Sequence, residues 1–297
     1  MRIFVTGGTG FIGRFVVREL QSQGHKLLLL SRQSRSVSDA DTILGGLSDI
    51  ARWQKELKRL SPEAAIHLAW EGLPNYDVQT SLRNLNYGLN LITTLADIGC
   101  QSVICSGSCW EYGQQSGRLS EDTGLKPYNA FTAAKNSLHW LGREIARERG
   151  MRFIWTRLFY VYGPGQRETS LIPYIIDCAR VGKKPEIKTP AARNDFIYVE
   201  DAARAFAAIV KKSQKDGVYN IGSGTATSVQ EIVNIICGHF NFQDGCGSLV
   251  SNSQSGDIWA DISRITEETG WRPETGTKEG IDRTIRALKE MSNGKDD

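Results

Sequence analysis

The sequence predicts an α/β fold in which a doubly wound parallel sheet has helices on both faces. Short apolar runs alternate with longer stretches of helical periodicity through the first half of the chain, which is typical of strand–helix–strand units. A glycine-rich segment, TGGTGFIG at residues 6–13, lies between the first apolar run and the first helical stretch. With 297 residues, the chain is long enough for one enlarged α/β unit or for two domains.

The predicted elements follow one another in a regular order at first and a mixed order later. Strands are expected at residues 3–5, 26–30, 64–69, 102–106 and 153–158, with helices at 15–20, 50–60, 84–99 and 130–150. After Tyr162, helices are expected at 171–180, 201–211, 228–240 and 278–289, and strands at 196–199 and 218–221. We interpret residues 1–165 plus about 193–222 as one domain, and about 166–192 plus 223–297 as a smaller C-terminal lobe interleaved with it.

Composition excludes several classes of protein. The 36 basic and 33 acidic residues leave a net charge of +3 and are scattered, so no footprint for nucleic acid is visible. The six cysteines include no CxxC pair, and no histidine stands at metal-ligand spacing, so we expect neither a metal site nor a disulfide framework. The apolar run at residues 3–5 is too short for a signal peptide or a membrane span. These features predict a cytoplasmic protein without membrane contact.

The glycine-rich segment has the spacing GxxGxxG, with Gly7, Gly10 and Gly13. Between a strand and a helix, bare backbone amides and the helix N-terminus can hold a pyrophosphate. A plain tight turn is the alternative, but the position directly after the first strand favours a dinucleotide site. Thr9, Phe11 and Ile12 belong to the same loop and are expected to contact the cofactor, which makes residues 1–165 plus about 193–222 an NADP-binding Rossmann domain.

This loop, together with the segments FTAAK, RLFYVYGPG and DFIYVED, resembles the extended short-chain dehydrogenase/reductase family, whose members modify nucleotide-linked sugars. The resemblance covers nearly the whole chain. Residues 171–178, LIPYIIDC, are similar to the reductases of CDP-linked 4-keto-6-deoxysugars, such as the abequose and paratose synthases. The resemblance implies a nicotinamide cofactor, and a homodimer that pairs the helices at 84–99 and 130–150.

The end of the second strand favours NADP(H) over NAD. An NAD site has a carboxylate here for the ribose 2′-hydroxyl, yet none occurs before Asp39. Ser31, Arg32 and Arg35 instead offer a hydroxyl and two guanidinium groups, which suit a 2′-phosphate. The alternative is that both arginines simply belong to a solvated loop.

The third predicted strand ends in the sequence HLAW, which is expected beside the cofactor. Leu68, Ala69 and Trp70 should line the cofactor cleft, whereas His67 is interpreted as a packed histidine rather than a base. By the family resemblance, Asn86 on the following helix would link that helix to water in the active site, with an exposed asparagine as the alternative.

The family's chemistry needs a phenol and an ammonium four residues apart on one helix, so that both project from the same face. Here the lysine is Lys135, and the position of the phenol is occupied by Phe131, which cannot transfer a proton. Three explanations stay open. Phe131 is an introduced replacement of tyrosine, or another donor serves (Tyr128, the Ser108 hydroxyl or a bound water), or the chain is a binding protein that has lost catalysis.

The segment SGSCWEYG follows the fourth predicted strand. By the resemblance, the Ser108 hydroxyl would bond the reacting sugar oxygen, unless it is an ordinary serine of a turn. In the family's 4,6-dehydratases the next two positions hold an acidic pair, but here they are Cys109 and Trp110, which disfavours dehydration. Trp110 is expected to contact the substrate, and Glu111 is interpreted as structural.

Four further residues are candidates for binding the substrate. Tyr160 stands where relatives have an asparagine near the sugar, and Arg167 and Arg193 are candidates for the substrate diphosphate. Trp259 stands where relatives often have an arginine, and it could stack on a base or a sugar.

The combined interpretation is an NADPH-dependent reduction of a keto group, at C4, on a nucleoside-diphosphate-linked deoxysugar, CDP-linked by preference. Ser108 would hold the carbonyl, while Lys135 would orient the nicotinamide ribose. An epimerase that retains NAD is the rival among enzymes. A catalytically silent NADP-binding sensor is the rival from another class.

Overall fold

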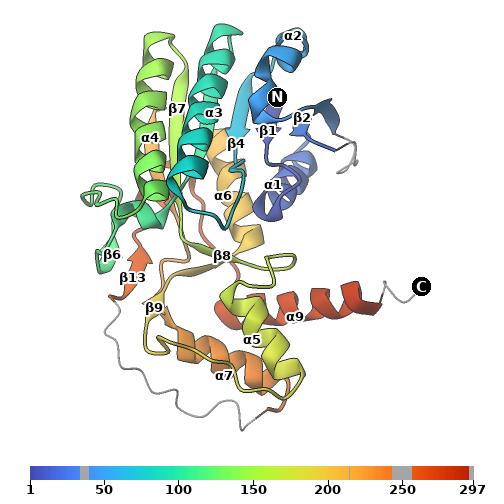
Figure 1. Ribbon diagram of the computed structural model, residues 1–297, viewed down its shortest axis with the longest axis vertical. Coiled ribbons are helices and arrows are strands. Elements are labelled where there is room, and N and C mark those ends of the chain that lie inside the picture. The colour runs from blue at the N-terminus through green and yellow to red at the C-terminus, as the bar shows by residue number, and fades with distance from the viewer. Residues whose placement is uncertain (34–39, 214, 243–255, 294–297) are drawn as a thin grey trace.

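The computed structural model describes residues 1–33, 40–213, 215–242 and 256–293 (Figure 1). Its centre is a seven-stranded sheet in the order β11-β7-β5-β4-β1-β2-β3, and every neighbouring pair in it is parallel. The strands are β1 (Arg2–Thr6), β2 (Lys26–Ser31), β3 (Asp41–Leu44), β4 (Ala64–His67), β5 (Ser102–Ser108), β7 (Arg152–Leu158) and β11 (Gly217–Ile221).

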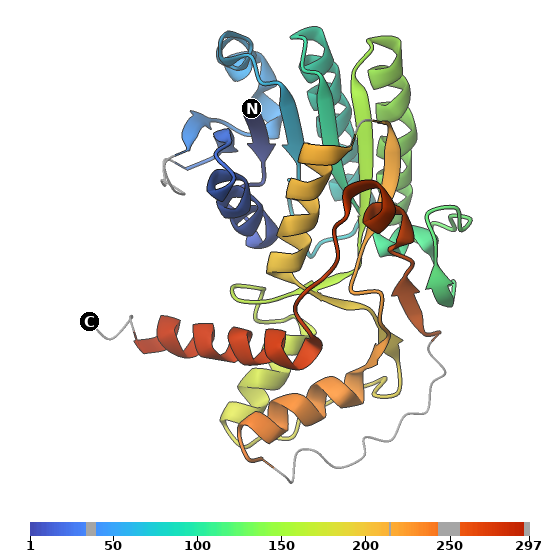
Figure 2. The same cartoon turned by 180° about the vertical axis from the view of Figure 1, so that it is seen from behind.

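Helices cover both faces of this sheet, which confirms the predicted fold class. Figure 1 shows α3 (Val78–Asp97) and α4 (Ala130–Glu148) on one face with α2 (Ile50–Leu60) beside them, and Figure 2 shows α1 (Phe11–Ser22) and α6 (Val199–Lys212) on the other. The alternation of β1 explains the two layers: Ile3 and Val5 are buried in the core with α1 and α6, whereas Phe4 is buried with α2, α3 and α4.

Most of the remaining elements lie beyond the carboxyl ends of the large sheet. A two-stranded sheet joins β8 (Tyr160–Tyr162) to β10 (Phe196–Tyr198), and a four-stranded sheet has the order β12-β9-β13-β6. Its strands are β6 (Gly117–Leu119), β9 (Arg193–Asn194), β12 (Thr227–Ser228) and β13 (Ile258–Ala260), and the helices are α5 (Leu171–Arg180), α7 (Val229–His239), α8 (Ser263–Thr269) and α9 (Thr277–Asn293). Of these helices, α8 packs on α6 and β11 rather than with α5 and α7. The division into a domain and an interleaved lobe stays a prediction.

Two departures from the predicted elements have local causes. The sequence does not predict the strand β3, because the segment contains no apolar run. Of its four residues, only Ile43 is buried. The helix α3 begins at Val78, six residues before the predicted start. The side chain of Asp77 caps it by accepting a hydrogen bond of 2.6 Å from the backbone N–H of Thr80, so the polar start of the helix is stable without an apolar pattern.

The glycine loop leads to a prediction about stability. In α1, a Cβ atom at Gly13 would overlap the carbonyl oxygen of Gly7, so the helix can start here only without a side chain. We expect Gly13→Ala to lower the free energy of unfolding by about 1–3 kcal/mol, as overpacking does. Gly238 in α7 is the matched control, since nothing lies within 4 Å of its Cβ position. Gly238→Ala should be neutral or stabilising in the same chemical denaturation, and equal effects of the two substitutions would contradict the argument.

Candidate active site

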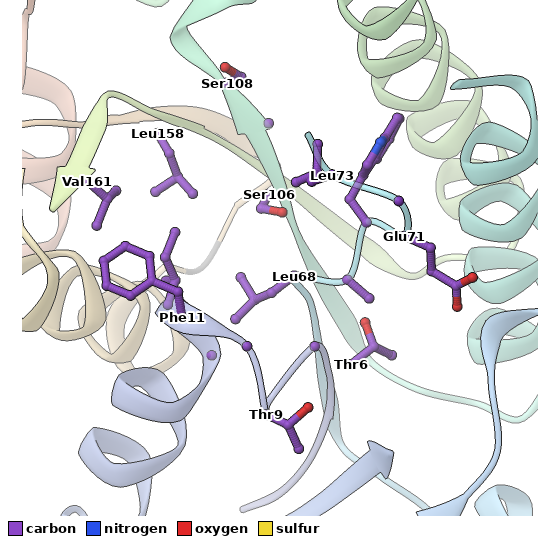
Figure 3. A pocket seen from close by; sticks show the side chains of 18 of the residues that line it. Thr6, Thr9, Phe11, Leu68, Glu71, Leu73, Ser106, Ser108, Leu158 and Val161 are labelled. Carbon is purple, nitrogen blue, oxygen red and sulfur yellow. The ribbon is translucent and has the colours of Figure 1, made fainter. Parts of the chain in front are cut away.

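A cavity of about 660 Å³ opens at the carboxyl ends of β1, β4 and β5 (Figure 3). It brings together seventeen of the predicted site residues, which come from the glycine loop, the strand ends, α4 and the segments after β5 and β8. They are Gly7, Thr9, Gly10, Phe11, Ile12, Gly13, Ser31, Arg32, Leu68, Ala69, Trp70, Ser108, Trp110, Phe131, Lys135, Tyr160 and Arg167. Residues that are far apart in the sequence therefore meet in one place, at the edge where parallel α/β sheets bind ligands.

The glycine loop leaves backbone amides free at the start of α1. Gly10 is the residue before the helix, and no side chain caps the helix there. Gly7 has a φ of +75°, and a Cβ atom on it would lie 2.7 Å from the backbone nitrogen of Ala69. The loop is thus pressed against the end of β4, and its amides and the positive end of the helix dipole suit a pyrophosphate.

The far end of the cavity is basic. The end of β2 lines this part of the cavity with Leu30, Ser31 and Arg32, and the segment after β3 lines it with residues 45–47. The Ser31 hydroxyl donates to the carbonyl oxygen of Gln33 at 2.8 Å, which shapes the turn that presents Arg32. Among the described residues that line the cavity, Glu71 has the one carboxylate, and it comes from the segment after β4. Arg35 lies outside the described residues.

His67 is buried at the end of β4 and supports the loop. Its Nδ1 lies 2.7 Å from the hydroxyl oxygen of Thr6 at the end of β1. Burial, with a smaller effect from the charge of Lys135, lowers the pKa of His67 to about 3. The side chain is therefore a neutral packed histidine at physiological pH.

Lys135 and Phe131 lie one turn apart in α4 and both face the cavity. The Lys135 Nζ donates to the carbonyl oxygen of Ser106 at 2.7 Å and lies 4.2 Å from the centre of the Trp70 ring. Burial lowers the pKa of Lys135 to about 8, against the opposing effect of Glu111. The Phe131 ring is buried and packs edge to face against Trp70 at 5.1 Å and Tyr76 at 5.2 Å between ring centres.

Ser108 ends β5 and is fixed from its backbone side by Glu111. Its N–H donates to the Glu111 carboxylate at 2.7 Å, and its hydroxyl oxygen accepts from the N–H of Trp110 at 3.2 Å. Glu111 is wholly buried and also accepts from Trp155 Nε1 at 3.0 Å and from Arg157 Nε at 3.2 Å. Burial raises the pKa of Glu111, while the Arg157 guanidinium opposes this effect. Glu111 is therefore a structural residue that positions Ser108.

The substrate candidates divide into two groups. Tyr160 and Arg167 line the cavity together with Gln166 and Ser170, which were not predicted. Arg193 and Trp259 are not among the described residues that line it. The Arg193 guanidinium is exposed and donates to the carbonyl oxygen of Ala226 at 2.8 Å, and Trp259 lies in β13.

The segment after β4 was missed as part of the site, and the asparagine that fixes it was misplaced. Glu71, Gly72 and Leu73 line the cavity. Asn84, not Asn86, holds this segment: its Oδ1 accepts from the Glu71 N–H at 2.7 Å, and its Nδ2 donates to the Glu71 carbonyl oxygen at 2.9 Å. Asn86 is exposed. Asn84 lies on the buried face of α3 with Gly88, Leu91 and Leu95, but as a polar residue it does not show this in the sequence.

The described ranges contain no group of three His, Cys, Asp or Glu side chains that could hold a metal ion. Five cysteines, which are Cys100, Cys105, Cys109, Cys178 and Cys237, are buried free thiols, and Cys246 lies outside these ranges. No helix in the described part of the chain is long and apolar enough to cross a membrane.

The buried Glu111 pair gives a second stability prediction. Glu111→Ala leaves the Arg157 guanidinium buried without its carboxylate, so we expect the free energy of unfolding to fall by about 3–5 kcal/mol. Asp97→Ala is the matched control, because Asp97 pairs with Arg149 at 2.9 Å on the surface. Its loss should cost about 0–1 kcal/mol. If urea denaturation gives similar losses in the free energy of unfolding for both variants, the buried pair does not stabilise the fold more than the surface pair.

Comparison with known proteins now defines the family. Residues 3–222 match the family model described as "NAD dependent epimerase/dehydratase family". The chain is 26% identical to dTDP-4-dehydro-6-deoxyglucose reductase of Escherichia coli, over 97% of both chains. It is 25% identical to dTDP-6-deoxy-L-talose 4-dehydrogenase (NAD(+)) of Aggregatibacter actinomycetemcomitans, over 82% of this chain and 92% of the relative.

Solved structures agree with these relatives. UDP-glucose 4-epimerase of Thermotoga maritima, solved with UDP-glucose, has the same fold with a TM-score of 0.87 and 23% identity, covering 98% of this chain and 100% of the other. The structure of MoeE5 in complex with UDP-glucose and NAD has a TM-score of 0.85 and 26% identity, and the match covers 98% of this chain and 100% of the other. Because the family match runs from β1 through the glycine loop, the Ser108 turn and the Lys135 helix to the end of β11, this chain belongs to the NAD-dependent epimerase/dehydratase family.

Proposed function

We propose that this protein reduces a keto group, at C4, on a nucleoside-diphosphate-linked deoxysugar with NADPH. The observation that supports this most is the continuity of the cavity, which runs from Arg32 past the glycine loop to Ser108 and Lys135. A dinucleotide laid along this line has its phosphates at the uncapped start of α1 and its nicotinamide beside the two side chains. The similarity to a dTDP-4-dehydro-6-deoxyglucose reductase supports the reaction class.

Each part of the cofactor has a fitting partner in the chain. The amides of residues 11 and 12 would bind the pyrophosphate, and Arg32 would bind the 2′-phosphate, with Arg35 as a further candidate. Lys135 would hold the nicotinamide ribose, with Leu68 and Ala69 against the cofactor from the end of β4. When bound, the reduced nicotinamide supplies a hydride.

The sugar would lie on the other side of Ser108. The backbone of Ser108 is fixed by Glu111, so its hydroxyl can donate to the carbonyl oxygen that gains negative charge during reduction. Trp110, Tyr160 and Arg167 would contact the sugar and its diphosphate. We keep Arg193 and Trp259 as candidates only for the outer part of the nucleotide, because neither lines the cavity.

Two other functions have observations in their favour. UDP-glucose 4-epimerases are among the relatives, for example one from Corynebacterium glutamicum at 25% identity, and an epimerase would retain NAD. Purified protein that carries tightly bound NAD(H) and shows no preference for a 2′-phosphate would support this function. Phe131 favours a silent NADP-binding sensor, which would bind NADP firmly but no nucleoside-diphosphate sugar.

We also infer a cytoplasmic homodimer that has a CDP-linked sugar as its substrate and contacts neither nucleic acid nor membrane. The half-exposed apolar side chains of Leu82 in α3 and of Trp140 and Leu141 in α4 fit the pairing of these two helices with a second copy. The two-lobe division would place the sugar nucleotide between residues 1–165 and the C-terminal lobe.

Cofactor choice can be tested at Arg32. Because a guanidinium bound to a phosphate contributes about 1.5–3 kcal/mol, Arg32→Glu should weaken NADPH binding by about 10- to 100-fold and affect NADH much less. Cofactor fluorescence titration measures both affinities. Arg52→Glu is the control, since Arg52 is exposed in α2 away from the cavity. Equal affinity of the unchanged protein for NADPH and NADH would contradict NADP specificity.

The reaction itself can be tested at Ser108. With NADPH and CDP- or dTDP-linked 4-keto-6-deoxysugars, we expect reduction, followed as loss of NADPH absorbance. Ser108→Ala should lower kcat by about 10²- to 10³-fold, as removal of one donor to a developing oxyanion does. Ser48→Ala, which changes an exposed serine of the 3-10 helix η1 (Leu47–Asp49), should leave kcat unchanged. No reduction of any keto sugar by the unchanged protein would overturn the proposed function.

A further inference from the structure

Reduction of a ketone consumes a proton as well as a hydride, and Phe131 has no proton to give. The identity of the proton donor rests on the proposed function. A donor must reach the substrate, and it must release its proton near neutral pH. The protonatable side chains in and around the cavity are compared on these two conditions.

Most of the candidates fail one of these two conditions. Burial raises the pKa of the Cys109 thiol and of the Tyr160 phenol, so both hold their protons more tightly than usual. Tyr128 is exposed, and Tyr76 packs against the outer side of Phe131; neither phenol is among the described residues that line the cavity. Glu71 lines it, but its carboxylate points away from Ser106 and Ser108 (Figure 3). The Ser108 hydroxyl can donate a hydrogen bond, yet an alcohol does not ionise near neutral pH.

Lys135 meets both conditions. It lines the cavity, and its ammonium has three protons, of which one is used by the carbonyl oxygen of Ser106. No carboxylate of the described residues forms a salt bridge with it. The titratable groups that face it are Glu111 from the 3-10 helix η2 (Cys109–Tyr112), Cys105 from β5 and His67 from β4.

None of these three groups holds the proton on Lys135 strongly. His67 is neutral, and the Cys105 thiol stays protonated because burial raises its pKa to about 12. The Glu111 carboxylate is taken up by Arg157 and Trp155. The indole of Trp70 and the ring of Phe131 cover the ammonium, with ring centres 4.2 Å and 5.9 Å from Nζ, and keep its surroundings apolar. Burial thus brings the pKa of Lys135 to about 8.

We propose that the ammonium of Lys135 itself gives the proton to the carbonyl oxygen of the sugar, in the place of the phenol that relatives have four residues earlier. As the hydride forms the new C–H bond, the π electrons of the carbonyl form the new O–H bond. One N–H bond of Lys135 breaks, its electron pair stays on Nζ, and the neutral amine regains a proton from water. Lys135 is then both the partner of the ribose and the acid.

The first test needs no turnover. Protein labelled with ¹³C at the ε-carbon of lysine is titrated by NMR without cofactor, and the Lys135 signal is assigned by its loss in Lys135→Arg. We expect the midpoint of the Lys135 signal near pH 8. A midpoint for Lys135 above about pH 10 in an active enzyme would overturn this assignment and leave the proposed reduction intact.

The second test separates an acid from a positioning residue. The acid form is present below its pKa, so kcat for reduction should be high below pH 8 and fall as the pH rises through it. Lys135→Arg keeps the charge but cannot release a proton in this range, so kcat should drop by about 10²- to 10⁴-fold while the Kd for NADPH changes by less than about threefold.

Phe131→Tyr supplies the missing phenol and completes this test. In the Phe131→Tyr background, Lys135→Arg should lower kcat by less than about tenfold. The pH at which kcat falls should also shift away from 8. If Lys135→Arg costs the same factor with Phe131 and with tyrosine, and the pH profile is unchanged, Lys135 only positions the cofactor. A protein that binds NADPH but reduces no keto sugar in either background overturns the proposed function and this assignment together.

Discussion

The buried carboxylate of Glu111 is the interaction on which the reactive end of the sheet depends. Glu111 accepts hydrogen bonds from the Ser108 backbone, from Trp155 and from Arg157, and so ties the ends of β5 and β7 to the turn between them. Arg157 extends the network to the hydroxyl of Tyr112 at 3.0 Å. A charge in this position is stable only if all of its partners stay in place, so the network fixes the backbone of Ser108 within narrow limits.

The same network reaches the smaller sheets. The Tyr112 hydroxyl donates to Asn220 in β11 at 2.7 Å, and the Asn220 amide donates to the carbonyl oxygen of Leu119 in β6 at 2.8 Å. Since β6 pairs with β13, the chain of contacts leads from the cavity into the C-terminal part of the molecule. The cavity wall at Ser108 is therefore held by hydrogen bonds to the core and to the smaller sheets.

The sequence predicted well those features that depend on local pattern. The glycine loop and the pair of Lys135 and Phe131 are recognisable because spacing along one loop or one helix fixes their geometry. Arg193 failed as a lining residue because its guanidinium is taken up by a backbone carbonyl from a segment 33 residues away in the sequence. Asn84 and the segment after β4 were missed because the buried stripe of α3 is polar or small in its first half, at Thr80, Asn84 and Gly88, so an apolar pattern does not mark it.

Phe131 changes the chemistry of the site while leaving its architecture intact. The phenyl ring packs against Trp70 and Tyr76, and the Trp70 ring lies 4.2 Å from the Lys135 ammonium. Burial in these surroundings lowers the pKa of Lys135 to about 8. Because a phenyl ring cannot give a proton, Lys135 is the one of the two cavity-facing side chains of α4 that can titrate, and its burial decides the pH range in which it does so.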